Sequence, residues 1–113
     1  MRIYLSTGGL KKLPSEAANY LLKNGIKNIE ISGGKFEKNK NNKILKNKKM
    51  INFNIHNYIP FYKKPFVFNL SSNNKKIIQN SINMAKKSIN LTSKLKSNYY
   101  ACHAGFLFDP KIN

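Results

Sequence analysis

The segment INFNIH, residues 51–56, alternates apolar and polar side chains without a break and ends in a histidine. Ile51, Phe53 and Ile55 would lie on one face of an extended chain, whereas the asparagines and His56 would lie on the other. Such a period of two residues predicts a β-strand with one buried face and one polar face. Other elements of the fold must therefore cover the apolar face and leave the polar face open.

Three further short apolar segments predict strands at residues 2–7, 27–32 and 98–103. Helical patterns between the strands occur at residues 14–25, around 42–48 and at 73–97. The first helix has Pro14 at its start and Gly25 just past its end, as is typical of helix termini. Its predicted apolar stripe is Ala17, Ala18, Leu21 and Leu22, and that of the last helix is Ile78, Ile82, Ala85, Ile89 and Leu95.

Strands and helices therefore alternate along the chain in the order β-α-β-α-β-α-β. Strands joined through helices pair in parallel with right-handed crossovers, which predicts the α/β class. In each predicted strand, apolar side chains oppose polar ones, whereas an open doubly wound sheet needs two apolar faces. A sheet that is apolar toward its helices and polar on its other side is typical of a segment of a barrel wall.

The chain is strongly basic, with 21 Lys and Arg, 4 Asp and Glu, and a formal charge of +17. Lysine supplies nearly all of this charge, although arginine is the usual residue for bidentate contacts with phosphate. One interpretation is codon drift toward A and T, since asparagine and isoleucine are also abundant, and the other is a surface for polyanions. Under either interpretation, non-specific binding to nucleic acid at low salt is expected.

No apolar segment has the length of a signal peptide core or a membrane span, so no membrane partner is predicted. The single cysteine, Cys102, cannot form an internal disulfide, which favours a reducing, cytoplasmic location. Alternation within residues 98–103 predicts that Cys102 faces the helices as an inert core residue.

Functional residues are predicted at the carboxyl ends of the strands, which meet at one edge of a parallel sheet. His56 and His103 end neighbouring predicted strands, so they should approach each other there. They are either strand-end histidines that only form hydrogen bonds or ligands of a divalent metal ion. Glu30 is either a catalytic carboxylate on the polar face or a buried acid balanced by a lysine. Asn54 and Tyr58, beside His56, are candidates for substrate binding.

Three segments resemble a known family: IEISGG (29–34), FNIHNYIPFYKKPFVFNLSS (53–72) and ACHAGFLFDP (101–110). They are similar to the sugar phosphate isomerase/epimerase proteins of the xylose isomerase-like TIM-barrel superfamily, which also includes the endonuclease IV type of DNA-repair enzyme. The resemblance implies an eight-stranded barrel with a divalent metal ion at its mouth. Because a TIM barrel takes about 250 residues, residues 1–113 are expected to be a single, partial domain. This domain would be the N-terminal half of the barrel, with about four strands and three helices.

For function, the resemblance implies metal-dependent isomerisation or epimerisation of a sugar or sugar phosphate. His56 and His103 match two histidines that are metal ligands in the DNA-repair enzymes of the superfamily. The implied ion is zinc, manganese or magnesium, and Glu30 would move a proton. The family's other ligands lie on strands five to eight, so the metal site is expected to be incomplete here. Self-association or a complementary half-barrel would cover the open strand edges. Two alternatives stay open: a DNA-repair hydrolase acting on abasic sites, and a truncated product without enzyme activity.

Overall fold

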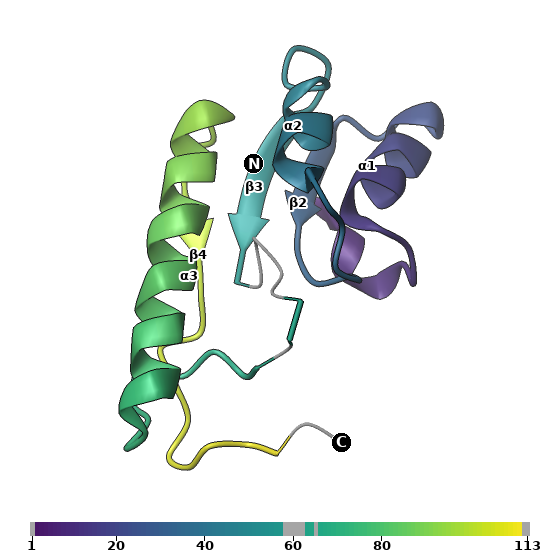
Figure 1. The fold of residues 1–113 in the computed structure, drawn as a ribbon. Helices are drawn as coiled ribbons and strands as arrows, with labels where there is room; N and C mark the ends of the chain where they lie inside the picture. The colour runs from purple at the N-terminus through teal and green to yellow at the C-terminus, as the bar shows by residue number, and fades with distance from the viewer. Residues whose placement is uncertain (1, 58–62, 65, 112–113) are drawn as a thin grey trace.

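A computed structural model of the chain describes residues 2–57, 63–64 and 66–111. Four strands form one parallel sheet in the order β1-β2-β3-β4, and helices connect consecutive strands (Figure 1). The strands are β1 (Leu5–Ser6), β2 (Asn28–Ile31), β3 (Asn52–His56) and β4 (Tyr100–Ala101). The helices are the 3-10 helix η1 (Thr7–Gly9) and the α-helices α1 (Pro14–Lys23), α2 (Lys40–Leu45) and α3 (Lys75–Lys94). The alternating elements and parallel pairing confirm the predicted α/β fold, with the arrangement of half a barrel.

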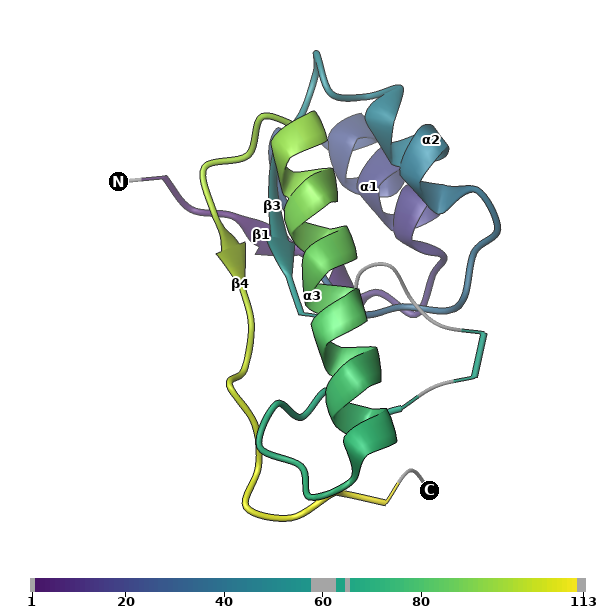
Figure 2. The ribbon, with the colours of Figure 1, turned by 60° about the vertical axis from the view of Figure 1, so that its left-hand side comes forward.

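The register of the strands explains how the sheet acquires two unlike faces. Ile29 pairs with Phe53, so the apolar side chains of β2 and β3 meet on one face. On the other face, Glu30 lies between Ser6 of β1 and Asn54 of β3. All three α-helices cover the apolar face, and no helix of the described residues covers the polar one (Figure 2). The side-chain alternation predicted from the sequence is therefore confirmed for the central strands.

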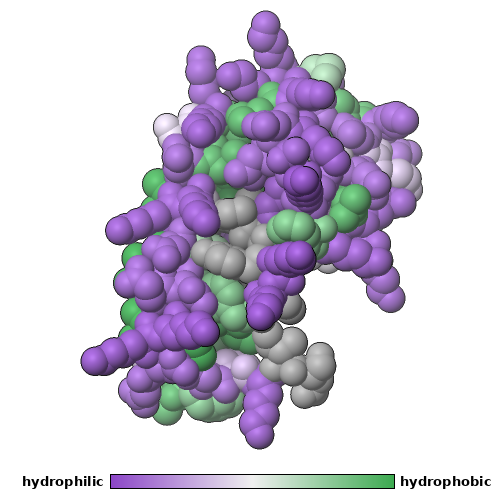
Figure 3. Space-filling view, in the orientation of Figure 1, coloured by the Kyte–Doolittle hydropathy of each residue, from purple (hydrophilic) through white to green (hydrophobic). Residues whose placement is uncertain are grey.

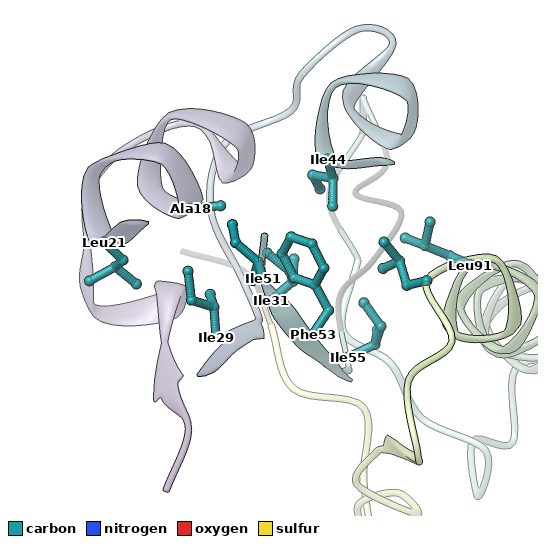
Figure 4. Close-up of a cluster of buried hydrophobic side chains, with 10 residues drawn as sticks. Ala18, Leu21, Ile29, Ile31, Ile44, Ile51, Phe53, Ile55 and Leu91 are labelled. Atoms are coloured by element: carbon teal, nitrogen blue, oxygen red, sulfur yellow. The ribbon is translucent and has the colours of Figure 1, made fainter. Parts of the chain in front are cut away.

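The hydrophobic core lies between the apolar face of the sheet and the helices (Figure 4). Ile29, Ile31 and Ile55 are 0% exposed, and Phe53 is 3% exposed. Burying each such side chain favours folding by about 1.5–3 kcal/mol, so this face holds the sheet and the helices together. The helices and their ends contribute Ala18, Leu21, Ile44, Leu91 and Leu95 to the core.

The start of α1 is capped by a residue that is distant in the sequence. Its own N-terminal residue, Leu13, provides no side-chain cap. The carboxylate of Glu37 instead accepts hydrogen bonds from the backbone N–H and the hydroxyl of Ser15, and another from Lys43. Burial alone would raise the pKa of Glu37, but these hydrogen bonds hold that pKa below its ordinary value. The negative charge also interacts favourably with the positive end of the helix dipole.

The face that α3 presents to the sheet differs from the predicted apolar stripe. Its buried residues are Ser81, Met84, Ser88, Leu91 and Thr92. Leu95, just past the helix, is buried as predicted, whereas Ile89 is 55% exposed, so the prediction for Ile89 was wrong. The hydroxyl of Ser81 accepts a hydrogen bond from the backbone N–H of Asn69. This bond reduces the free-energy cost of burying the Ser81 side chain. Apolar spacing alone could not show that two small serines, Ser81 and Ser88, would occupy the contact.

The edges of the sheet also differ from the sequence predictions. β1 and β4 contain 2 residues each, fewer than the predicted strands. Ile3 and Leu5 are 76% and 48% exposed, because β1 is an edge strand with a neighbour on one side only. β4 ends at Ala101, so strand alternation no longer applies to Cys102. The prediction of a core cysteine was wrong, since Cys102 is exposed.

Over the described residues, no helix is both long and apolar enough to cross a membrane. The longest helix, α3, has 20 residues and carries lysines in its first, middle and last turns.

Candidate functional site

The carboxyl ends of β2, β3 and β4 meet at one edge of the sheet, where three of the predicted site residues gather. Glu30 belongs to β2, His56 ends β3, and His103 follows shortly after β4. The ring centroids of His56 and His103 lie 5.2 Å apart, with an angle of 67° between the ring planes. Oε1 of Glu30 lies 3.8 Å from Nδ1 of His56. The predicted approach of the two histidines is confirmed.

The three side chains stand at different depths in the mouth of the half-barrel. His56 pairs with Ala101 in the sheet, so His103 lies farther toward the carboxyl-terminal edge than His56 does. Glu30 pairs with Asn54, which places Glu30 deeper than His56. The side chains of His56 and Glu30 are 27% and 26% exposed, whereas His103 is exposed. The inner part of the site is therefore sheltered, and its outer part is open to solvent.

A hydrogen-bonding group orients the ring of His56. Oγ of Ser32 lies 3.3 Å from Nδ1 of His56. Ser32 is held by Thr7, whose hydroxyl donates to the carbonyl of Ser32 at 2.9 Å and accepts from its N–H at 3.0 Å. Because Nδ1 faces Ser32 and Glu30, Nε2 is the nitrogen left to contact a ligand. In metal sites, a second group commonly orients a histidine ligand in this way.

The segment that carries His103 is tied to the loop before α3. Oδ1 of Asn69, a residue that is 0% exposed, accepts a hydrogen bond from the backbone N–H of Phe106 at 2.9 Å. Nδ2 of Asn69 donates to Asp109 at 2.8 Å, and the hydroxyl of Ser72 donates to the same carboxylate at 2.7 Å. These bonds hold the chain on the far side of His103, so they also limit where its ring can lie.

Gly105 permits the close approach of these two segments. A Cβ atom at this position would lie 2.5 Å from Oδ1 of Asn69 and 2.7 Å from Oγ of Ser71. Such distances are shorter than real Cβ contacts, so a larger residue would push the two segments apart. Glycine is therefore needed in the turn that directly follows His103.

The structure leaves the predicted substrate contacts untested. Tyr58 lies outside the described residues. Asn54 is on the polar face but 0% exposed, and its Oδ1 accepts a hydrogen bond from the hydroxyl of Ser97 at 3.0 Å. Its Nδ2 is buried and has no hydrogen-bond partner among the residues that the structure describes. A substrate oxygen would satisfy this N–H group, so the role of Asn54 stays a prediction.

The residues present fit part of a metal site. Two imidazoles and a carboxylate suit zinc or manganese better than magnesium, which prefers oxygen donors. Within residues 2–57, 63–64 and 66–111, however, no group of three or more His, Cys, Asp or Glu side chains is arranged to hold an ion. His56 and His103 can offer two nitrogen donors, with the carboxylate of Glu30 behind the ring of His56.

Ser32, Asn69 and Asp109 support the site, although the sequence patterns did not point to them. Ser32 could have been found, because alternation places it on the same face of the chain as Glu30. Asn69 and Asp109 are 40 residues apart, and no local pattern indicates that their side chains meet.

Comparisons with protein-family models, with curated proteins and with solved structures found no match to this chain. The resemblance to sugar phosphate isomerases therefore rests on the residues of the sequence alone.

Proposed function

We propose that this chain is the N-terminal half of the barrel of a metal-dependent isomerase or epimerase that acts on a sugar or sugar phosphate. The observation that carries the proposal is the convergence of Glu30, His56 and His103 at the carboxyl-terminal edge of a parallel sheet. Barrels built from parallel strands carry their active sites at this edge. The proposed location is the cytoplasm, where the exposed thiol of Cys102 would stay reduced.

Isomerisation and epimerisation of a sugar can both proceed by removal of a proton from one carbon atom and its return to the same or another position. The carboxylate of Glu30 is suited to take and return this proton, because it is sheltered but still 26% exposed. His56 lies 3.8 Å from that carboxylate and can help to hold it in position. Glu30 is therefore the proposed proton-transfer residue.

His56 and His103 are the residues that would hold a divalent ion, and their nitrogen donors favour zinc or manganese. Such an ion, when bound, polarises a carbonyl or hydroxyl oxygen of the substrate. Ser32 orients the ring of His56, and Asn69 positions the segment that carries His103. The remaining ligands would come from water or from a partner that supplies the rest of the barrel.

A partner half would also cover surface that this chain leaves open. β1 and β4 form the two edges of the sheet. Ile3 near the first edge is 76% exposed, and Tyr99 at the second is 51% exposed. Strands of a second copy or of a complementary half could pair with both edges and enclose the polar face. Sedimentation at micromolar concentration tests this part of the proposal, and a monomer that unfolds cooperatively would contradict it.

Metal binding is tested by titrating Zn²⁺ and Mn²⁺ into the chain and into variants at the two histidines. We expect His56→Ala and His103→Ala each to lower the affinity by about tenfold or more, the size of effect seen when metal sites are disturbed. Glu30→Gln should weaken binding less, and Glu16→Gln, which changes an exposed carboxylate on α1, is its matched control. A double histidine variant that binds as tightly as the parent would show that the histidines are not ligands.

The reaction class is tested by screening ketoses, sugar phosphates and duplex DNA with an abasic site. Turnover of a sugar that Glu30→Gln abolishes and Glu16→Gln leaves intact would support the proposal. Metal-dependent cleavage at the abasic site would instead favour the DNA-repair alternative.

A further inference from the structure

A cleft lies at the opposite edge of the sheet from the candidate site, where the strands begin. Its volume is about 460 Å³. Four exposed cationic residues line it: Arg2 before β1, Lys48 and Lys49 between α2 and β3, and Lys96 between α3 and β4. In Figure 3, hydrophilic side chains project from the end of the molecule at which β3 begins.

No acidic residue offsets the charge in this cleft. The chain has 4 acidic residues, and none of them lines the cleft. Glu30 lies on the polar face near His56, and Glu37 forms an ion pair with Lys43 at 2.8 Å. Cations gathered in a concave site without counter-charges raise the local positive potential, which attracts an anionic ligand.

The cleft offers contacts besides charge. Ile51, Phe53 and Leu95, at the margin of the core, form its apolar part. Tyr4 contributes a half-buried aromatic ring, and Asn98 an exposed amide. Cations beside an aromatic ring are the combination that binds single-stranded nucleic acids, because phosphates meet the cations and bases stack on the ring.

We propose that this cleft binds single-stranded nucleic acid, with its four cations against the phosphates and Tyr4 against a base. Membrane surfaces bind cations that are presented along one amphipathic helix. The cations of this cleft come instead from three separate segments of the chain. An acidic peptide would satisfy the charges but would leave the ring of Tyr4 without a base. A duplex keeps its bases stacked and paired, so it could use the cations alone.

The inference does not depend on the proposed isomerase activity. The cleft lies at the amino ends of the strands and shares no residue with the group formed by Glu30, His56 and His103. Loss of nucleic-acid binding should therefore leave the affinity for Zn²⁺ or Mn²⁺ unchanged.

The test is fluorescence anisotropy with a labelled single-stranded oligonucleotide of mixed sequence over a series of salt concentrations. The cleft variant combines Arg2→Gln, Lys48→Gln, Lys49→Gln and Lys96→Gln. Its matched control combines Lys23→Gln, Lys75→Gln, Lys76→Gln and Lys86→Gln, which remove the same charge from exposed residues outside the cleft. Each phosphate contact contributes about 0.7 to the slope of log affinity against log salt concentration. Removing four such contacts should therefore reduce the magnitude of this slope by about 2.8 in the cleft variant. We expect a loss of affinity of about tenfold or more for the cleft variant and of less than about threefold for the control.

Stacking on Tyr4 is tested by Tyr4→Leu, which should weaken single-strand binding by about fivefold or more and leave duplex binding unchanged. Mapping of amide chemical shifts on the parent chain should show changes at residues 48–52 and 95–98, and this measurement needs no variant to fold. Equal losses in the cleft and control variants would overturn the proposal, because the affinity would then belong to the total charge. Competition by polyglutamate as strong as that by the oligonucleotide would also overturn it.

Discussion

The two faces of the sheet are stabilised in different ways, and β3 contributes to both. Phe53 and Ile55 belong to one continuous cluster of buried apolar side chains on the helix-covered face. Asn54 and His56, on the opposite face of the same strand, each contact one or two polar neighbours. Apolar packing sums many small contacts, whereas each polar contact depends on one geometry. Stability and candidate chemistry therefore lie on opposite sides of the same strand.

The largest effect is expected where the apolar face is broken. Phe53→Ala removes a side chain that is 3% exposed and should lower the free energy of unfolding by about 3–5 kcal/mol. Phe36→Ala is the matched control, since Phe36 is 47% exposed, and should cost less than about 1 kcal/mol. Urea denaturation measures both values. Similar losses for the two variants would show that burial on this face does not determine stability.

The helix-covered side of the sheet is not entirely apolar, because it also contains a buried lysine, Lys40. Lys40 is 4% exposed, and burial lowers its pKa from 10.5 to about 8, although the nearby charge of Glu37 raises it in part. Between these two pH values the unfolded chain keeps the proton that the folded chain has lost, so stability should rise with pH. The rise due to Lys40 is at most about 3 kcal/mol.

This effect is measured as the free energy of unfolding from pH 7 to pH 10. The parent should gain stability over this range relative to Lys40→Met, which lacks the titrating group. Lys38→Met, at an exposed neighbouring position, should keep the slope of the parent. Burial raises the pKa of Tyr100 to about 12, so the folded-state phenol stays neutral across the range. Parallel curves for the parent and Lys40→Met would contradict the prediction.

A smaller effect is expected where the polar side depends on a close approach. Gly105→Ala would force a Cβ atom toward Asn69 and Ser71, and we expect it to cost about 1–3 kcal/mol. It should also weaken metal binding, because the segment that carries His103 would move. Gly9→Ala is the control, since a Cβ there meets nothing within 4 Å. Equal metal affinity in the two variants would show that Gly105 does not position His103.

The smallest effect on stability is expected at His56, whose side chain is 27% exposed. His56→Ala should change the free energy of unfolding by less than about 1 kcal/mol, because it removes only long polar contacts, to Ser32 and Glu30, from a partly exposed side chain. The adjacent replacement Ile55→Ala, on the buried face, should cost about 2–5 kcal/mol. Urea denaturation of the pair compares the two faces directly, and a reversed order would refute the division between them.

Whether a sequence-based prediction of burial was correct depended on whether neighbouring residues or tertiary packing set that burial. The alternation in 51–56 predicted the apolar face of β3, and Ile51, Phe53 and Ile55 are buried there, although Asn54 on the polar face is buried as well. The same reasoning was wrong for Cys102, because β4 ends at Ala101, before that residue. Helical spacing was wrong for Ile89, because α3 is rotated so that its buried face consists of Ser81, Met84, Ser88, Leu91 and Thr92.

The order of the elements, the parallel α/β arrangement and the apolar and polar faces of the central strands could all be predicted from the sequence. These properties follow from side-chain periodicity and helix termini, which are set by neighbouring residues. Three features became visible only in the folded chain: Glu37 caps α1, Asn69 and Asp109 hold the segment around His103, and cations from separate loops share one cleft. These contacts join residues far apart in the chain, so their distances are set only when the helices pack on the sheet.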